Sequence, residues 1–306
     1  MAEISAKAVA ELRKQTGCGM MDCKNALKDA NGDFEAAVKI LREKGMAAVA
    51  KKASRIAAEG IVDIMTIGNT TAIVEVNSET DFVAKNATFQ SFVKDVLKSI
   101  IAAKPANVDE LLAAKFADTD STVSEALAEN IYKIGEKISI RRFQIVEGTV
   151  STYVHGLGAT GVIVSFDTDV ADKDGFAEFA KNVALQTAAM TVLYLDRDSV
   201  PASVLEEEKA ILLKQMSEDP KMANKPQQVL ENIVKGKLGK YYETNCLVEQ
   251  TYVKDDSMTV RKYAETTAKA LGGSIKITGY VRFDKGEGLQ KREEDFAAEI
   301  QKMVQG

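Results

Sequence analysis

The side chains best suited to chemistry in this sequence are few. There is one histidine, His155, and there are three cysteines, Cys18, Cys23 and Cys246. Histidine is the commonest general acid or base near neutral pH, but His155 has no predictable Ser or Cys partner. Cys18 and Cys23 are five residues apart with no second Cys or His pair nearby, which argues against a zinc site. Cys23 falls on an apolar helix face, which favours a buried structural thiol over a nucleophile.

Motifs for nucleotide or cofactor binding are also missing from the sequence. It contains no G-x-x-x-x-G-K-[ST] pattern and no G-x-G-x-x-G after a predicted strand. Gly156-Leu157-Gly158 is predicted to form a hairpin turn, a common position for glycine. Acidic residues are numerous, but none forms a pair that the pattern places in a pocket. We therefore expect a binding protein rather than an enzyme, with no cofactor, no metal and no direct nucleotide binding.

The most informative short segment is Thr80-Asp81-Phe82-Val83, which follows a predicted strand and starts a predicted helix. In one interpretation, Thr80 or Asp81 caps the helix and Phe82 enters the core. In the other, an exposed acid lies beside an exposed aromatic ring, and the pair inserts into a partner protein. The segment alone leaves both interpretations open.

Composition limits the class of protein that must position these residues. A chain of 306 residues suggests two or three folded units, and 45% hydrophobic with 28% charged residues is typical of a soluble globular protein. No stretch approaches the roughly 20 apolar residues of a membrane helix, and the first residues lack the pattern of a signal peptide. The sparse, odd number of cysteines fits a reducing compartment. We therefore expect a cytoplasmic protein that does not bind membranes.

Charge is distributed unevenly along the chain. The net charge is −5, whereas nucleic-acid-binding proteins usually carry an excess of basic residues. The first 55 residues hold eleven Lys or Arg against seven Asp or Glu, a net charge of +4. That excess is ordinary for a solvated helical surface. It also permits an alternative function, a non-catalytic adaptor or RNA-binding module that uses the basic N-terminal helices.

The N-terminal segment is predicted to form three short helices. The first covers residues 5–16, with Ser5 as N-cap and Gly17 at its end. Asp22 is the predicted cap of the second helix, and the third runs from Phe34 to about Lys44, where Gly45 ends it. Residues 47–58 are rich in Ala and Lys and are predicted to be a connecting helix. The bundle resembles a ubiquitin-associated domain.

An internal repeat with an offset of 88 residues follows the bundle. Each copy is predicted to hold two strands and a helix, beginning with the strands 61–67 and 72–77 in the first copy. The matching positions are Glu59-Gly60 with Glu147-Gly148, Val62 with Val150, Gly68 with Gly156, Val74 and Val76 with Val162 and Val164, and Thr80-Asp81 with Thr168-Asp169. After a gap of one residue, Phe89, Phe92, Lys94 and Val96 match Phe176, Phe179, Lys181 and Val183. The repeat predicts a duplicated α+β core.

Two amphipathic runs at residues 200–218 and 229–238 surround a turn with prolines and predict an antiparallel helical hairpin. A strand at residues 275–283 is expected to complete the second sheet, which makes the hairpin an insertion. A last helix is expected from Glu293 to Val304.

The fold class is therefore α+β with five predicted parts. These are a helical domain with its linker at 1–55, a first core subdomain at 56–146, a second core subdomain at 147–194 and 247–288, an inserted coiled-coil hairpin at 195–246, and a C-terminal helical module at 289–306.

Four segments resemble the bacterial elongation factor Ts family. They are LRKQTGCGMMDCKNALKDANGD at 12–33, AAEGIV at 57–62, VNSETDFVAKNATFQSF at 76–92 and GYVRFDKGEGLQKREEDFAAEI at 279–300. The resemblance implies a factor that binds the GTPase elongation factor Tu and promotes exchange of GDP for GTP. It also implies the architecture expected above.

The resemblance further implies which residues contact the GTPase. Asp81 and Phe82, flanked by Thr80 and Val83, match the family motif that enters the GTPase near its nucleotide-bound magnesium. Arg13, Met20 and Met21 match contact residues of the N-terminal bundle, and His155 matches the histidine of a Tyr-x-His-Gly segment. Thr168-Asp169-Val170 in the second copy lacks the phenylalanine, so no such role is expected there.

Overall fold

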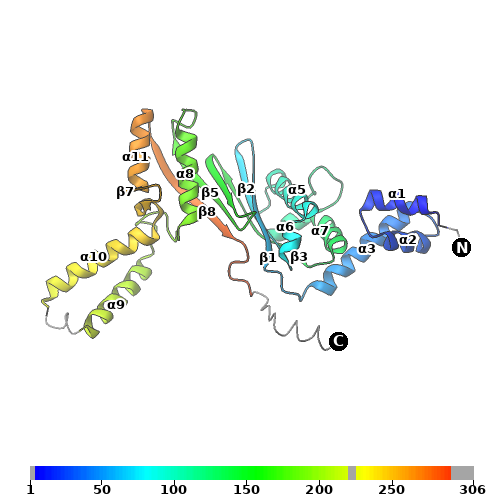
Figure 1. Ribbon diagram of the computed structural model, residues 1–306, viewed down its shortest axis with the longest axis horizontal. Coiled ribbons are helices and arrows are strands. Elements are labelled where there is room, and N and C mark those ends of the chain that lie inside the picture. Colours follow the sequence, from blue (N-terminus) through cyan, green and yellow to red (C-terminus); the bar gives the residue numbers. More distant parts are fainter. Residues whose placement is uncertain (1–3, 220–224, 291–306) are drawn as a thin grey trace. The chain divides into compact units, whose positions relative to one another are not determined.

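Helices and small sheets make up the computed structural model, which describes residues 4–219 and 225–290 (Figure 1). The fold class is α+β, as predicted. Two compact units share the chain: among the described residues, the first holds those up to Ile145, Val154–Thr160 and those from Phe283 onward, and the second holds Val146–Tyr153 and Gly161–Arg282. The finer division into five parts stays a prediction. Within the described residues, every helix is too short or too polar to cross a membrane.

The first unit begins with a bundle of three helices, α1 (Ala6–Thr16), α2 (Met20–Asp29) and α3 (Phe34–Lys52). The Ser5 hydroxyl accepts the Ala8 amide and Gly17 ends α1 in the left-handed conformation, both as predicted. The prediction for α2 was wrong by three residues, because its N-cap is Gly19 and Asp22 lies in the first turn. A carboxylate in that turn still interacts favourably with the helix dipole. The bundle core is formed by Val9, Leu12, Cys18, Cys23, Ala26, Leu27, Ala37 and Leu41.

Helix α3 does not end at Gly45, contrary to the prediction. It continues to Lys52 and takes up half of the predicted connecting segment. Gly45 lies where α3 packs against α7 (Val123–Ile134), and a Cβ at this position would be 3.3 Å from the Ala128 carbonyl oxygen. The glycine permits two helix backbones to approach closely, and it serves packing rather than termination.

The first sheet has the order β1-β2-β3, formed by β1 (Glu59–Ile67), β2 (Thr70–Ser78) and β3 (Ile138–Glu147). β1 and β2 pair antiparallel around a turn at Gly68-Asn69, with Ile61 opposite Val76. The helices α5 (Ala87–Ala103), α6 (Val108–Ala113) and α7 contribute to the same hydrophobic core as these strands. β3 was not predicted. Its apolar residues are interrupted by Arg141 and Arg142, which hides the strand pattern.

Strand β2 is buried along its whole length. Ala72, Val74 and Val76 belong to the core with α5. On the alternate positions lies Glu75, whose carboxylate is fully buried and accepts hydrogen bonds from the guanidinium groups of Arg141 (3.0 Å) and Arg142 (2.6 Å). A third donor is the Gly286 amide, at 2.8 Å. Ion pairing and hydrogen bonding therefore permit a charged side chain to be buried on this face of β2.

Burial alone would raise the pKa of Glu75. The hydrogen bonds from Gly286, Asn77, Arg142 and Arg141 outweigh burial and hold the pKa of this carboxyl below its usual value. The carboxylate is therefore charged at neutral pH and joins β2, β3 and the segment after Phe283.

The second unit repeats this plan. Its sheet has the order β4-β5-β8, from β4 (Thr149–His155), β5 (Thr160–Thr168) and β8 (Ile275–Asp284), and α8 (Phe176–Ala189) packs on it (Figure 1). β8 completes the sheet as predicted. Two additions were not predicted: α11 (Val260–Leu271) and a two-stranded sheet of β6 (Thr251–Tyr252) and β7 (Asp255–Thr259). They follow the short 3-10 helix η1 (Leu247–Glu249).

The predicted hairpin is present as α9 (Ala202–Glu218) and α10 (Gln227–Asn245). Leu212, Met216, Val234 and Leu238 form its own small hydrophobic core. Residues 220–224 of its predicted proline-containing turn and the predicted helix from Glu293 to Val304 lie outside the described residues.

Candidate functional site

The Thr80 turn, residues Thr80 to Val83, follows β2 and forms the N-cap and first residues of the short helix α4 (Asp81–Ala84). Thr80 is extended (φ −127°, ψ 157°), and its hydroxyl accepts the Val83 amide at 3.4 Å, so Thr80 caps α4. Val83 is buried, whereas the Phe82 side chain is 79% exposed. The capping interpretation is therefore right for Thr80, but its expectation that Phe82 enters the core is wrong.

Asp81 is the acid beside the exposed ring. Its carboxylate lies 2.6 Å from the Lys85 ammonium group, one turn along the chain, and both side chains are half-exposed. The same ammonium group lies 6.0 Å from the centre of the Phe82 ring. The hydrogen bond from Lys85 lowers the pKa of Asp81, so the carboxylate is ionised at neutral pH. The turn therefore presents a negative charge and an aromatic surface side by side.

The equivalent turn in the second unit is used differently. Asp169, the match of Asp81, accepts the Ser274 amide at 2.7 Å, and this bond lowers the pKa of Asp169. Val170, the match of Phe82, is only 2% exposed and belongs to the core of the second unit. The repeated turn is thus a packing element in one unit and an exposed projection in the other.

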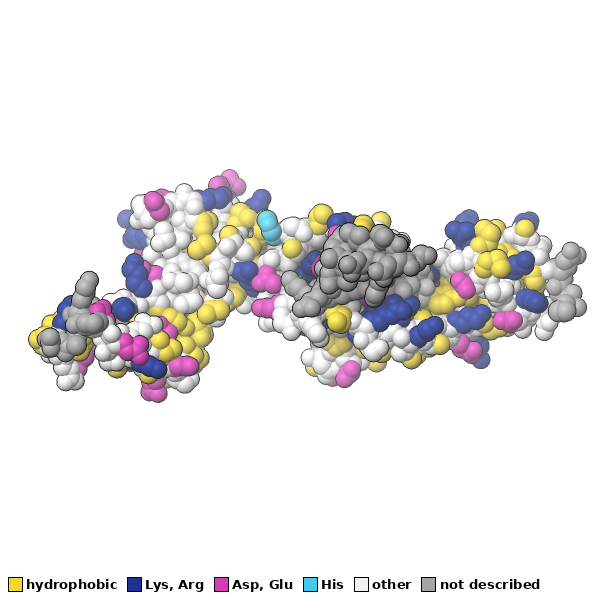
Figure 2. Space-filling model, turned by 60° about the horizontal axis from the view of Figure 1, so that its bottom comes forward, with side chains coloured by type: hydrophobic (Ala, Val, Ile, Leu, Met, Phe, Trp, Pro, Cys, Tyr) yellow, Lys and Arg dark blue, Asp and Glu magenta, His cyan; other side chains and the backbone are white. Residues whose placement is uncertain are grey.

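The predicted contact residues of the bundle are on its surface. Arg13 on α1 is exposed, and Met20 and Met21 at the start of α2 are 52% and 63% exposed. Neither methionine fills the bundle core. Lys and Arg side chains are distributed over the surface of the bundle, at the right of Figure 2.

His155 is exposed at the end of β4. The turn after it is attached to β1, because the Gly158 carbonyl accepts the Val62 amide at 2.8 Å. A Cβ on Gly158, which has a positive φ of 90°, would collide with Ile61. All eight predicted site residues, including His155, therefore belong to the first unit.

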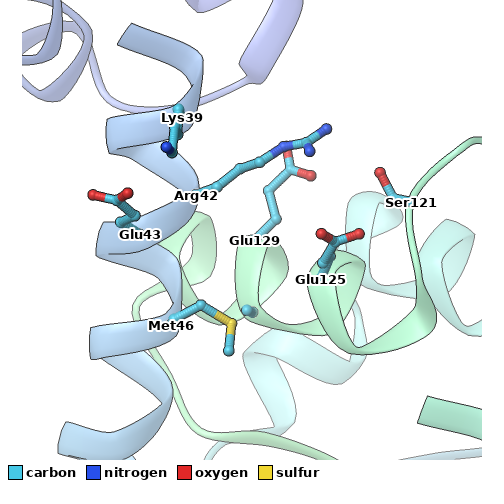
Figure 3. Close-up of a pocket in the computed structure, with 8 residues that line it drawn as sticks. Lys39, Arg42, Glu43, Met46, Ser121, Glu125 and Glu129 are labelled. Atoms are coloured by element: carbon cyan, nitrogen blue, oxygen red, sulfur yellow. The ribbon is translucent and has the colours of Figure 1, made fainter. Parts of the chain in front are cut away.

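A cavity of about 260 Å³ lies between α3 and α7, and the sequence did not predict it. Figure 3 shows Arg42 extending from α3 toward Glu129 of α7, with Met46 below them. Its remaining lining is Lys39, Glu43, Ser121, Glu125 and Ala128. No local motif predicts such a cavity, because its two walls, residues 39–46 and 121–129, are far apart in the sequence.

The cysteines are buried and free of disulfides. Burial raises the pKa of the Cys246 thiol to about 11, and burial also raises that of Cys18. Cys23 is buried in the bundle core, as predicted. Across residues 4–219 and 225–290, no group of three or more His, Cys, Asp or Glu side chains could hold a metal ion.

Comparison with known proteins identifies the relatives of this chain. The family model described as elongation factor TS matches residues 79–287. Proteins named elongation factor Ts from Syntrophotalea carbinolica and Clostridium kluyveri are each 46% identical to it, over 99% of both chains. The protein of that name from Clostridioides difficile is also 46% identical, over 99% of this chain and 100% of its own length.

These matches place the chain among the elongation factors of protein biosynthesis. It belongs to the elongation factor Ts family. Residues 79–287, which the family model covers, include the Thr80 turn and His155.

Proposed function

We propose that this protein is the guanine-nucleotide exchange factor of the GTPase elongation factor Tu. It binds the GDP form of that GTPase and disturbs the magnesium and phosphate site. GDP then leaves and GTP can bind. The observation that carries this proposal is the Thr80 turn, where Phe82 is exposed beside an ionised Asp81. Aromatic residues are enriched at the buried centres of protein–protein interfaces, so an exposed ring beside a charge suits a contact with a partner.

The proposed mechanism requires binding rather than covalent chemistry. In a GTPase, magnesium bridges the phosphates to the protein and supplies much of the local positive charge. Asp81 and Phe82 would displace the groups that hold this ion, which weakens the retention of GDP. Because coupling between two ligands is reciprocal, a factor that loosens GDP is itself loosened by GDP. The protein therefore acts in the cytoplasm as a catalyst of exchange without an active site.

Other residues of the first unit would extend the contact. Met20 and Met21 are exposed, flexible and apolar, which suits an adaptable surface. Arg13 and His155 supply polar contacts in the same unit. These four residues add affinity, whereas Asp81 and Phe82 act on the nucleotide.

The test is the release of fluorescent GDP from elongation factor Tu with this protein and with its Asp81→Ala and Phe82→Ala variants. We expect the natural protein to accelerate release strongly and each variant to lose at least about tenfold, the cost of truncating one central contact. Circular dichroism melting should be unchanged, because both side chains lie at the surface.

Matched control variants remove a carboxylate or an exposed apolar side chain elsewhere in the first unit. Glu129→Ala deletes a half-exposed carboxylate that also pairs with a lysine four residues along, Lys133. Ile67→Ala deletes another exposed apolar side chain. Both controls should exchange at the natural rate. Release that is unaffected by the natural protein would refute the proposal.

The alternative is an adaptor or RNA-binding module that uses the N-terminal bundle, with its net charge of +4 over the first 55 residues. It predicts RNA affinity that falls steeply with salt, because each neutralised phosphate releases counterions. If GDP release is unchanged and such binding is found, the alternative replaces the exchange factor.

A further inference from the structure

Every hydrogen-bonding group of Thr80 is held by a neighbour. Its amide donates to the Glu136 carboxylate (3.0 Å to Oε2), and its hydroxyl donates to the other oxygen of that carboxylate (2.8 Å to Oε1). Its carbonyl accepts the hydroxyl of Ser78 at 2.9 Å. The residue immediately before Asp81 and Phe82 is thereby fixed in position. Most of this fixation comes from one carboxylate, 56 positions further along the chain.

The attachment is reciprocal. Glu79 accepts the Lys137 amide at 2.6 Å, while Glu136 accepts the Thr80 amide. The dipeptides 79–80 and 136–137 therefore hold each other, because each supplies a glutamate carboxylate that binds a backbone amide of the other. Hydrogen bonds to a charged acceptor are about twice as strong as neutral ones. We call this arrangement the Glu79–Glu136 clamp.

The clamp also reaches the end of the N-terminal bundle. The Arg55 guanidinium group donates to Glu79 at 3.1 Å, and the Lys137 ammonium group donates to the carbonyls of Ala53 (2.7 Å) and Arg55 (2.9 Å). The segment that leaves α3 is thus bound to the same place that holds the Thr80 turn.

We propose that Glu136 is a positioning residue for nucleotide exchange. It holds the Thr80 turn so that Phe82 and Asp81 point at the GTPase before the two proteins meet. The inference rests on the proposed function and goes beyond it, since Glu136 is not among the residues predicted to touch the partner. Its role is to reduce the conformational freedom that binding would otherwise have to remove.

The turn needs this external support. Helix α4 has only four residues, and a single helical turn has no stability of its own in water. Val83 and Ala84 fix the inner face of the turn in the core, but the exposed Phe82 is not held by packing and depends on the position of Thr80 before it. In the second unit, where the matching turn is held by packing of Val170, the Thr168 hydroxyl donates to the Ser274 carbonyl. In the first copy the supporting carboxylate, Glu136, comes from outside the turn, whereas in the second copy it is the turn's own Asp169 that bonds Ser274.

The test uses two readouts on the full chain. The first is release of fluorescent GDP from elongation factor Tu with the Glu136→Ala and Glu136→Gln variants. The second is the fluorescence anisotropy of a Phe82→Trp reporter, whose indole is the only one in the protein because the natural chain has no tryptophan. The reporter is measured with and without Glu136→Ala, in the absence of the GTPase.

We expect Glu136→Ala to lower the maximal release rate at saturating factor about tenfold, the effect of losing hydrogen bonds to one charged group. The concentration that gives half of that rate should change much less. Glu136→Gln should be intermediate, since its amide oxygen can still accept one of the two hydrogen bonds. The anisotropy of the indole reporter should fall in Glu136→Ala, which reports a looser turn.

The matched control is Glu125→Ala. Glu125 also accepts a threonine amide, that of Thr122 at 2.8 Å, but at the start of α7. The Glu125→Ala variant should leave both the release rate and the anisotropy at their natural values. It therefore distinguishes the effect of losing a helix cap from the effect of losing the clamp. Exchange and anisotropy that are natural in Glu136→Ala would overturn the inference and leave the proposed function standing. If the natural protein does not promote release, the proposed function fails, and anisotropy alone decides whether Glu136 holds the turn.

Discussion

At the scale of single residues, Glu75 illustrates how a charge can occupy the interior of the first unit. Its carboxylate has no exposed surface and is surrounded by Arg141, Arg142 and the Gly286 amide. Taking a charge out of water costs several kcal/mol unless partners compensate for it. Here four donors, including Asn77, provide the compensation. The energetic consequence is that removal of the carboxylate leaves two arginines without their buried partner.

We predict that Glu75→Gln lowers the free energy of unfolding of the first unit by about 3 kcal/mol at pH 7. Because the folded pKa of Glu75 lies below its ordinary value of 4.5, its contribution is complete above pH 4.5. The contribution is lost as the pH falls through the folded pKa. The difference between natural and variant proteins in urea unfolding should therefore be constant from pH 6 to 8 and shrink in acid.

A suitable comparison is Glu287→Gln, which removes an exposed carboxylate that pairs with Arg142. Exposed ion pairs contribute at most about 1 kcal/mol, so this variant should be nearly as stable as the natural protein. Equal losses for the two variants would show that burial of Glu75 has no special energetic role.

At the scale of secondary-structure elements, the crossing of α3 and α7 determines how the N-terminal bundle attaches to the first sheet. Gly45 brings the α3 backbone against Ala128, and Tyr132 of α7 packs on the bundle core. Glycine is a poor helix former, costing about 1 kcal/mol relative to alanine. The structure keeps it because a side chain would separate the two helices.

Substitution of Gly45 by leucine should therefore destabilise the protein by about 1–3 kcal/mol through overpacking, in spite of the better helix propensity of leucine. The same substitution at Gly236 in α10, where a Cβ would meet no other atom within 4 Å, should raise stability slightly. Thermal unfolding gives the overall sign, and amide hydrogen exchange of α3 and α10 assigns each effect to its helix. Stabilisation by both leucines would contradict the close approach of α3 and α7.

At the scale of the whole molecule, the chain contains two similar units, of which one carries the candidate site. Both have a three-stranded sheet, a covering helix and a threonine-aspartate turn. In the first unit the position after the aspartate is the exposed Phe82, and in the second it is the buried Val170. A protein that needs one projecting ring can therefore keep the second copy for stability.

Exchanging these two residues tests that division of roles. Phe82→Val should reduce GDP release from elongation factor Tu without changing the melting temperature, because the ring is exposed. Val170→Phe should give no gain in release and should destabilise the second unit by about 1–3 kcal/mol, since a ring does not fit the packed core. A Val170→Phe variant that is stable and exchanges faster would show that the second turn is also accessible to the partner.

Local interactions explain which parts of this architecture could be predicted. The cap at Ser5 and the end of the first helix at Gly17 depend on residues at most four positions apart, and the structure contains both of them. The internal repeat predicts two strands and a helix in each copy, and the structure contains them. Strand β3 and helix α11 escaped, because charged residues in β3 obscured its alternation and α11 lies beyond the end of the repeat.

The sequence by itself determined the α+β class, the duplicated core, the helical hairpin and the position of the Thr80 turn. Only the tertiary structure decided that Gly45 lies inside a helix, that Glu75 is buried and that Phe82 projects into solvent. It alone brought Glu136 to Thr80. The physical reason is the range of the interactions. Helix caps, turns and hydrophobic periods are set by neighbours in the chain, whereas burial, ion pairing and support of the exposed turn depend on residues that meet only after the chain has folded.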